Sequence, residues 1–439
     1  MSLIDAHTQT VKPDNEALPD LIHRKNAVRL IPLLFICYLF AHLDRINIGF
    51  AKIQMSADLQ FSNSVYGLGA GLFFVSYMLF GVPSNMVLDK VGPRRWIAFL
   101  MVSWGLMSAG MMGVETPLAF YVLRFLLGVA EAGFFPGILL FINRWFATNR
   151  RAQVTAWFAI AVPMAGVVGA PVSGWILEAF SDSSTLRGWQ WMFLLEGLPV
   201  VLLGLVVLSV LPDNFNEARW LAEHERIALG QLVGGQASID ERGRFGTLLR
   251  NPQVALLIVI YSAVMLGMGV VAFWMPTLIS GAGVAHSHQI GVLSAVPYLV
   301  GCFCMVLTGR SSDRRRERRW HVFIPLLATA IGIALTALAP QSLLLVMLGM
   351  VLACAGATTA LAMFWQLPAG IISSRDLAIG IAFVSSCGSV ASFLSPALVG
   401  WMKDSSGSAS LALLLLSALI LIGSVVVFAL PKHQVNPAR

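Results

Sequence analysis

The chain has 439 residues, of which 57% are hydrophobic and only 12% are charged. Soluble proteins carry about 25% charged residues, and a chain with so few charges cannot keep this much apolar surface away from water. The composition therefore excludes a soluble globular protein and predicts an all-α membrane protein.

Twelve apolar runs follow one another along the chain, and runs of this length cross a hydrocarbon core of about 30 Å. The first run is too long and too interrupted to be a signal peptide. The runs cover residues 28–50, 65–88, 96–113, 118–141, 152–177, 190–211, 253–280, 289–309, 321–339, 342–366, 377–401 and 409–430. The sequence thus predicts twelve transmembrane helices in two six-helix halves.

One long polar segment divides the chain between the sixth and seventh runs. It is too small for a catalytic domain and favours a linker with a short surface helix. The expected organisation is a tail, a six-helix bundle, a linker, a second six-helix bundle and a tail, over residues 1–27, 28–211, 212–251, 252–430 and 431–439.

Lysine and arginine predict the orientation, because they gather in cytoplasmic loops. With the amino terminus inside, the inside segments contain 24 of the 29 basic residues, and the outside loops contain Lys52, Arg187 and Lys403. Both termini are therefore expected in the cytoplasm, and the short loops favour a bacterial inner membrane. The same bias explains the net charge of +7 without a nucleic-acid partner.

The loops after the second and eighth helices resemble each other, as internal repeats do. The first contains Asp89 and Arg94, and the second contains Asp313 and Arg314. Transporters built from such repeats bind substrate between the halves near the middle of the membrane. The sequence therefore predicts a binding site between the two bundles.

Four charged residues interrupt the apolar helices of the first half: Asp44, Arg45, Arg124 and Glu131. Charges inside a membrane are costly and usually mark a pathway. At 1.5 Å per residue, Asp44 lies about 22 Å from the inner end of its helix and Arg124 about 9 Å from the outer end of its own, so both reach similar depths. Glu131 lies two turns deeper on nearly the same face as Arg124.

These residue types suit the coupled movement of an organic anion and protons. A guanidinium group binds a carboxylate through two hydrogen bonds and stays charged, whereas a carboxylate withdrawn from water binds a proton more readily. Alternatively, Arg124 pairs with Asp44 or Glu131 simply to join two helices.

Aromatic and polar residues offer further contacts to a substrate. In the second half, aromatic rings could stack on the body of an acid, although packing against lipid or other helices explains any single ring equally well. His42 could relay protons or could fill a packing role. The candidate substrate-binding residues, besides the two arginines, are Tyr38, His42, Trp274, Tyr298, Trp365, Gln366 and Ser385.

The sequence contains no nucleophile–base or metal constellation of the kind that an enzyme needs. The five cysteines lie in apolar runs and fit small buried side chains. We therefore expect no enzymatic activity, no cofactor and no metal, with the proton gradient as the driving force and a monomer as the working unit.

Over residues 25–430 the chain resembles the major facilitator superfamily. The loop Asp89-Lys90-x-Gly92-x-Arg94-Arg95 is similar to the superfamily signature between helices two and three. Asn85 stands where that pattern usually begins with glycine, while the second copy keeps Gly309. The resemblance implies that Asp89 and Arg94, and in the second copy Asp313 and Arg314, gate the cytoplasmic side.

Two longer motifs resemble the anion:cation symporter family of that superfamily: Leu43-Asp44-Arg45-Ile-Asn47-Ile-Gly49-Phe-Ala51 and Arg124-Phe-Leu-Leu-Gly128-Val-Ala-Glu131-Ala-Gly133-Phe-Phe-Pro136-Gly137. Phe273-Trp274-Met-Pro276 is similar to the branch that carries phthalate, tartrate and hydroxyphenylacetate. The resemblance implies that Arg45 and Arg124 bind or gate the anion and that Asp44 and Glu131 carry protons.

The expected function is thus proton-coupled uptake of a small organic carboxylate by alternating access. The partners are the organic acid, protons and the bilayer. The alternative is a proton-driven exporter of drug-like or anionic compounds, which the paired arginines disfavour only for cationic substrates.

Overall fold

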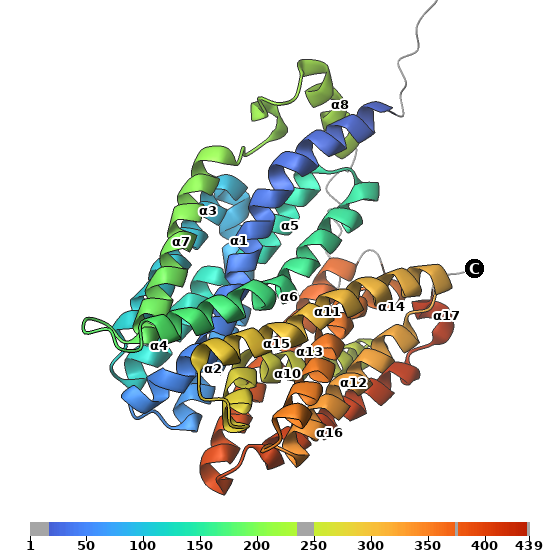
Figure 1. The fold of residues 1–439 in the computed structure, drawn as a ribbon. Coiled ribbons are helices and arrows are strands. Elements are labelled where there is room, and N and C mark those ends of the chain that lie inside the picture. Colours follow the sequence, from blue (N-terminus) through green and yellow to red (C-terminus); the bar gives the residue numbers. More distant parts are fainter. Residues whose placement is uncertain (1–16, 235–249, 374–375, 437–439) are drawn as a thin grey trace, which may run out of the picture.

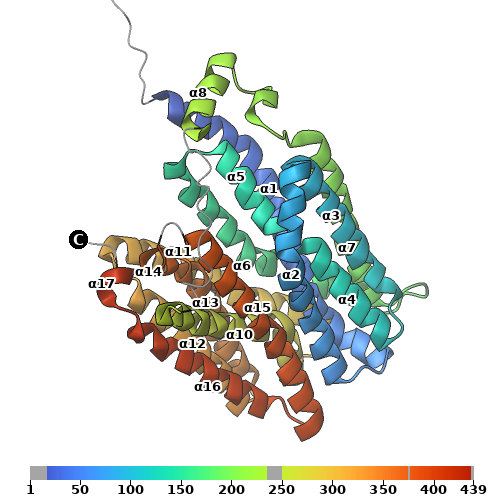
Figure 2. The ribbon, with the colours of Figure 1, turned by 180° about the vertical axis from the view of Figure 1, so that it is seen from behind.

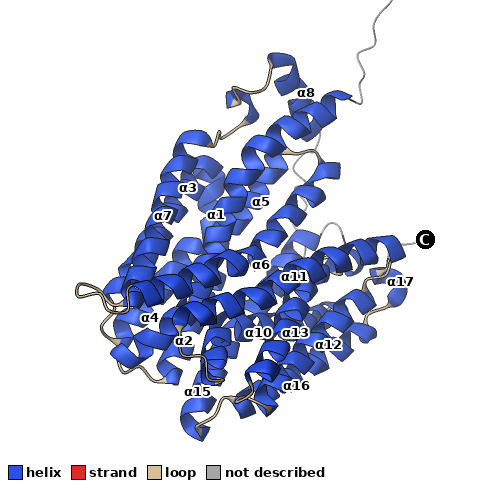
Figure 3. Cartoon of the chain, viewed as in Figure 1, coloured by secondary structure: helices blue, strands red, loops and turns tan. Residues whose placement is uncertain are grey.

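The computed structural model describes residues 17–234, 250–373 and 376–436. These residues contain twelve helices that are long and apolar enough to cross a membrane, and they contain no strand (Figure 3). The predicted all-α, twelve-helix membrane protein is therefore confirmed. The predicted tails and linker fall partly on residues 1–16, 235–249 and 437–439, which lie outside the described residues.

The amino-terminal half contains six of the spans, followed by the small linker helix. Its helices are α1 (Ala17–Asp58), α2 (Asn63–Val91), α3 (Pro93–Gly110), α4 (Pro117–Glu131), α5 (Phe134–Trp145), α6 (Thr148–Ala179) and α7 (Gly188–Val210), and the linker contains α8 (Glu223–Gly234). Short 3-10 turns occupy Met111–Gly113 (η1) and Phe215–Glu217 (η2).

The carboxyl-terminal half contains the other six spans. Its helices are α10 (Pro252–Gly281), α11 (Ser287–Arg315), α12 (Arg319–Leu338), α13 (Leu343–Phe364), α14 (Pro368–Ile371), α15 (Leu377–Ser406), α16 (Ser410–Val426) and α17 (Lys432–Val435), with a 3-10 turn at Val427–Ala429 (η3).

Two predicted spans are each broken into two helices. The fourth span divides into α4 and α5, and the tenth divides into α13 and α14. A proline follows each break, at Pro136 and Pro368. Because proline has no N–H, it cannot donate to the carbonyl four residues earlier, and the helix ends there. Helix α1 also differs from expectation, since it begins at Ala17 instead of near Val28.

The two halves meet at one end of the molecule and diverge toward the other (Figures 1 and 2). We call the end at which α1 begins and α16 ends the terminal end, and the opposite end the distal end. Across the halves, α6 packs on α11, α2 packs on α15, and α1 packs on α10. These three helix pairs form the seam between the halves.

Glycines allow the closest approaches along this seam. A Cβ atom on Gly400 of α15 would overlap the carbonyl oxygen of Asn63 at the start of α2, and one on Gly291 of α11 would overlap the carbonyl of Ala170 in α6. Small residues let helices approach closely in membranes. The glycines of helix α6 do not all face the seam. Gly174 faces α11, whereas Gly169 packs on Leu43 within its own half.

Polar contacts close the distal end. Asp404, near the end of α15, accepts hydrogen bonds from the backbone and side chains of Asn63 and Ser64 at the start of α2, at 2.6–3.1 Å. On the opposite side of the seam, Glu178 of α6 pairs with His286 at 2.9 Å. The conformation is therefore closed at the distal end.

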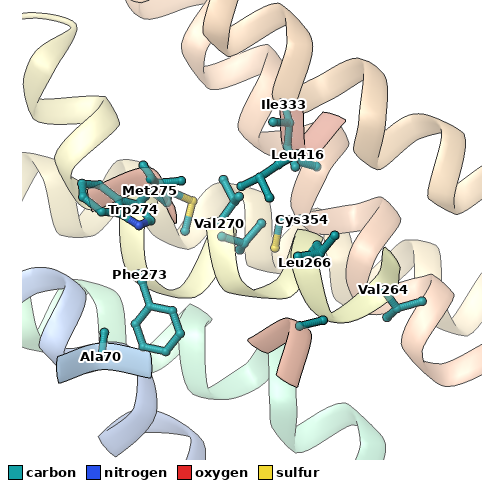
Figure 4. Packing of buried hydrophobic residues seen from close by; sticks show 14 of the residues in the cluster. Ala70, Val264, Leu266, Val270, Phe273, Trp274, Met275, Ile333, Cys354 and Leu416 are labelled. Atoms are coloured by element: carbon teal, nitrogen blue, oxygen red, sulfur yellow. The ribbon is translucent and has the colours of Figure 1, made fainter. Parts of the chain in front are cut away.

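Helix α10 forms the centre of the carboxyl-terminal half and also reaches into the seam. Figure 4 shows buried side chains of α10 directed toward Ile333, Cys354 and Leu416, while Phe273 points to Ala70 of α2. The Tyr66 hydroxyl donates to the carbonyl of Phe273 at 2.9 Å. The core of one half is thus continuous with α2 of the other.

Candidate functional site

An ion pair joins α1 to the end of α4. The Arg45 Nη2 and Nε atoms lie 2.7 Å and 2.8 Å from Glu131 Oε1. The Glu131 side chain is only 1% exposed, whereas the Arg45 side chain is 21% exposed. Arg45 is therefore the accessible member of the pair. Glu131 is the last residue of α4, so the break before Pro136 determines its position.

The Phe73 ring of α2 contacts both arginines. The Arg45 Cζ atom lies 5.3 Å from the centre of the Phe73 ring, and the Arg124 Cζ atom lies 5.2 Å from it. Arg45 is also 5.0 Å from the Tyr77 ring. Rings at this distance attract a guanidinium group. The structure thus places Arg45 and Arg124 on the same aromatic ring.

Arg124 has no ion pair among the residues that the structure describes. Its side chain is buried with 1% exposure, and its Nε and Nη2 atoms donate to the carbonyls of Gly69 and Ala70 at 3.4 Å and 3.3 Å. The charges of Asp44, Glu131 and Arg45 act on it through space. Direct pairing of Arg124 with Asp44 or Glu131, the purely structural alternative, is not what the structure contains.

Asp44 lies among neutral donors. Its Oδ1 atom accepts from the Ser108 hydroxyl of α3 and, at 3.1 Å, from Asn47 Nδ2. Its Oδ2 atom is buried and has no hydrogen-bond partner. Among the described residues, Asp44 is therefore a buried carboxyl group with one unpaired oxygen and no direct cation partner.

Glu196 of α7 is a third buried carboxyl group that the sequence analysis missed. It is 4% exposed, its Oε1 atom accepts from the Ser173 hydroxyl at 2.6 Å, and its Oε2 atom has no partner. The signal was available, because Glu196 interrupts the apolar run over residues 190–211 just as Glu131 interrupts its own.

Tyrosines from both halves surround Arg45. Tyr261 of α10 interacts electrostatically with Tyr38, Tyr77 and Arg45 of the other half. These side chains therefore lie near one another across the seam. Tyr77 was not predicted from the sequence. These tyrosines contact three residues predicted from the sequence. The ring centres of Tyr38 and His42 are 4.6 Å apart, and those of Tyr261 and Trp365 are 4.8 Å apart. Tyr261 also forms a hydrogen bond with Ser385.

Three predicted substrate-binding residues lie elsewhere. Trp274 is fully buried in the distal closure, where the Lys52 Nζ atom lies 4.9 Å from its ring. The Tyr298 ring packs on Gly166 where α6 meets α11. Gln366 lies in the break between α13 and α14, and its carbonyl accepts from Arg318 at 2.8 Å. In this conformation none of the three joins the group around Arg45.

The predicted gate residues lie toward the terminal end. The Arg94 Nε atom donates to the carbonyl of Leu208 at 2.5 Å, and its backbone N–H donates to Asp213 at 3.1 Å. Asp313 and Arg314 are exposed at the end of α11. The side chain of Asp89 lies outside what the structure describes. Arg94 thus contacts its own half.

Known proteins resemble this chain along its whole length. Residues 34–369 and 285–439 match the Major Facilitator Superfamily. A protein of Pseudomonas putida named for metabolite transport is 42% identical, over 98% of this chain and 99% of its own length. A protein of Agrobacterium vitis named for tartrate transport is 40% identical, over 95% and 96%. One of Acinetobacter baumannii named for quinolone resistance is 37% identical, over 91% and 92%.

Solved structures share the fold at low sequence identity. A bacterial homologue of the human lysosomal transporter Spinster, in an inward-facing and occupied conformation, superposes with a TM-score of 0.75 at 16% identity, over 93% of this chain and 98% of that one. The xylose transporter XylE from E. coli, in a partially occluded inward open conformation, gives 0.73 at 14% identity, over 94% and 99%.

Proposed function

Because the chain belongs to the Major Facilitator Superfamily and is a membrane transporter of the anion:cation symporter type, we propose that it takes up a small organic carboxylate together with protons by alternating access. The ion pair between Arg45 and Glu131 is the observation that carries this proposal. It places a cation that suits a carboxylate directly on a group that accepts a proton.

The substrate and Glu131 compete for the same guanidinium group. While Glu131 is ionised, it occupies Arg45 through two hydrogen bonds. A proton on Glu131 removes the negative charge that binds Arg45, and the accessible face of Arg45 then becomes free for a substrate carboxylate. Charge-assisted pairs of arginine with carboxylates are among the stronger polar contacts. Proton binding and anion binding therefore favour each other.

Arg124 contributes a fixed positive charge to the same place. Its guanidinium group is buried without an ion pair among the described residues, and a buried charge of this kind favours a nearby anion. The rings of Tyr38, Tyr77 and Tyr261 supply hydroxyl groups and apolar faces beside Arg45. An aromatic acid or a hydroxy acid fits this combination, and the relative named for tartrate transport supports the hydroxy acid.

The proposed orientation places both termini in the cytoplasm of a bacterial cell, with the protein in the inner membrane. This assignment rests on the excess of lysine and arginine at the terminal end. The distal closure then faces the outside, and the conformation is open toward the cytoplasm. Asp89, Arg94, Asp313 and Arg314 are proposed to close the cytoplasmic side in the other half of the cycle.

Export is the second candidate function. The relative named for quinolone resistance favours it, and a quinolone also carries a carboxylate. The same two arginines would then bind the anion on its way out. The direction of net movement in proteoliposomes with an imposed proton gradient distinguishes the two candidates.

Glu131→Gln tests the coupling. The amide mimics a protonated carboxyl group, so Arg45 is free at every pH. We expect substrate exchange to continue in proteoliposomes, while substrate-driven proton uptake falls to background. The acid to use is the one that most raises the melting temperature of the purified protein in a screen of small carboxylic acids at two pH values.

Glu115→Gln is the matched control, because Glu115 is an exposed acid of the same half and should leave proton uptake unchanged. Unaltered proton co-transport in Glu131→Gln would show that another group carries the proton. Stabilisation of the protein by cationic or neutral amphiphiles alone would contradict a carboxylate substrate.

A further inference from the structure

The buried charges around Arg45 and Arg124 do not balance. Lys52, another buried cation of this half, lies apart in the distal closure, on Asn63 and the Trp274 ring. Asp44, Glu131 and Glu196 are at most 4% exposed, and the cations beside them are Arg45 and Arg124. If every group were ionised, one negative charge would remain without a counterpart. An uncompensated charge in a low-dielectric interior is costly and is usually removed by proton binding.

Glu196 is the acid in excess. The Arg45 ion pair belongs to Glu131, and Arg124 acts on Asp44. Glu196 contacts neutral groups instead: Ser173 and Asn47, with Asp44 as the charged group that faces it.

Among the residues that the structure describes, the helices packed against α7 supply no cation at this position. They are α1, α3, α6 and the turn η1. Helix α1 contributes Asp44 and Asn47, α3 contributes the Ser108 hydroxyl bonded to Asp44, and α6 contributes the Ser173 hydroxyl. The turn η1, Met111–Gly113, has no titratable side chain. A proton is therefore the simplest means of neutralising Glu196.

The hydrogen bonds of Asn47 indicate where that proton is needed. Asn47 Nδ2 donates to Asp44 Oδ1 at 3.1 Å, which leaves Asn47 Oδ1 as a buried acceptor without a donor. Asp44 Oδ2 and Glu196 Oε2 are buried without partners as well. Three neighbouring oxygens thus have no hydrogen-bond donor, and a protonated carboxyl group would supply one. Buried polar groups are normally hydrogen-bonded, so these three oxygens need an explanation.

We propose that Asp44, Asn47 and Glu196 form a second proton-binding site, separate from the Arg45–Glu131 pair, and that Glu196 holds its proton. In the binding step a carboxylate oxygen takes one proton from a hydronium ion, which leaves as water, and becomes an O–H group; the release step reverses this. Hard metal cations such as Ca²⁺ take about six to eight oxygen ligands, more than the three free oxygens here, so the site favours a proton.

Glu196 lies nearer the distal end than Glu131. Glu196 is about 12 Å of helix from the distal start of α7, whereas Glu131 is about 21 Å from the distal start of α4. A proton that enters from the distal side therefore reaches Glu196 before Glu131. This part of the inference, a second proton moved in each cycle, rests on the proposed function, whereas protonation of Glu196 does not.

Infrared spectroscopy of the purified protein in lipid tests the site without any substrate. A protonated carboxyl group has a carbonyl stretching band that a carboxylate lacks. We expect the spectrum at pH 7 to lose one such band in Glu196→Gln and to keep it in Glu115→Gln. An unchanged band in Glu196→Gln would overturn the proposal. If Glu196→Gln does not insert, Ser173→Ala serves instead, because loss of the hydroxyl donor shifts the same band to higher frequency.

Counting protons during transport tests the role in the cycle. Glu196→Gln is expected to transport substrate with one proton fewer per molecule than the wild type. An unchanged ratio in an active Glu196→Gln variant overturns that role. A sodium-dependent rise in melting temperature that Glu196→Gln abolishes, with no carboxyl band lost, overturns the proposal in favour of a sodium site. A wild type that moves substrate without protons contradicts the proposed function alone, and the infrared result then still decides the site.

Discussion

Arg45 of α1 and Arg124 of α4 have the same side chain, yet they have different surroundings. Arg45 is partly accessible and pairs with Glu131. Arg124 is buried and donates to two consecutive carbonyls of α2, Gly69 and Ala70. Ala70 also meets Phe273 of the opposite half (Figure 4). Arg124 therefore connects the candidate anion site with the seam between the halves.

Arg124→Lys tests whether the planar guanidinium group is required. A lysine retains the charge but has a single ammonium group, which cannot contact two carbonyls and the Phe73 ring in the same way. Loss of a hydrogen bond to a charged group costs about 1.5–3 kcal/mol, so we expect substrate binding to weaken about 10- to 100-fold. Thermal-shift titration of the purified protein measures this effect.

Arg187→Lys is the matched control, because that side chain is 68% exposed and should tolerate the change. Wild-type affinity in Arg124→Lys would mean that charge alone matters at this position. Wild-type affinity in Arg124→Ala would remove the residue from the site altogether.

At the scale of elements, the linker helix α8 is attached to the start of α1. Glu225 is 2% exposed and pairs with Lys25 at 2.6 Å. The Trp220 indole donates to Asn26 at 2.9 Å and its ring stacks on Trp145 at 5.6 Å. Burial acts to raise the pKa of Glu225, but hydrogen bonds from Lys25 and Ala222 outweigh it, and the pKa lies below its usual range. The linker is thus part of the amino-terminal half.

Glu225→Gln should make the stability of this half depend less on pH. Because the folded-state pKa is below the ordinary value of 4.5, the ionised group stabilises the fold above that value, and its contribution is lost as the pH falls through the folded-state pKa. We expect a lower melting temperature than the wild type at pH 7 and a difference that shrinks below about pH 4.

Glu223→Gln on the same helix is the control, since Glu223 is exposed and should leave the melting temperature within the error of the wild type. A constant difference between Glu225→Gln and the wild type across this pH range would contradict the ionic contribution.

At the scale of the whole molecule, alternating access requires the distal end to open. Asp404 forms a large part of its polar closure, because one carboxylate accepts from the backbone and side chains of Asn63 and Ser64. These residues are the first of α2 and their N–H groups lie at the positive end of the helix dipole. A carboxylate from one half thus caps a helix of the other.

Asp404→Asn should open the distal end. The amide loses the negative charge and turns an NH₂ group toward two of the four donors, which costs about 1–2 kcal/mol. That energy corresponds to a shift of about 5- to 30-fold between the conformations. Pulsed electron resonance between spin labels at Asp182 and Ala285, exposed on the distal loops of the two halves, measures the distance distribution.

Glu217→Gln, at an exposed acid of the terminal end, should leave that distribution unchanged. A distribution in Asp404→Asn identical to the wild type would show that the distal end stays closed without the Asp404 contacts.

The four charges that interrupt helices of the first half were predictable, because each stands out against an apolar background. Glu196 obeys the same rule and was overlooked. The partners were not predictable: that Glu131 pairs with Arg45 while Arg124 binds carbonyls depends on side-chain rotamers and on where the helices cross. Trp274 and Tyr261 show the same limit, since both are aromatic residues of one apolar helix. Only the three-dimensional contacts reveal that Trp274 lies in the distal closure and Tyr261 near Arg45.

The sequence by itself determined the number of membrane spans, their division into two halves and which spans contain charged residues, because length, hydropathy and residue type are local quantities. The tertiary structure alone decided which charged side chains meet, which end is closed and which carboxyl group lacks a cation. Those outcomes depend on contacts between helices far apart in the chain, such as α15 with α2 and α1 with α7, and a single helix carries no information about the surface that packs against it.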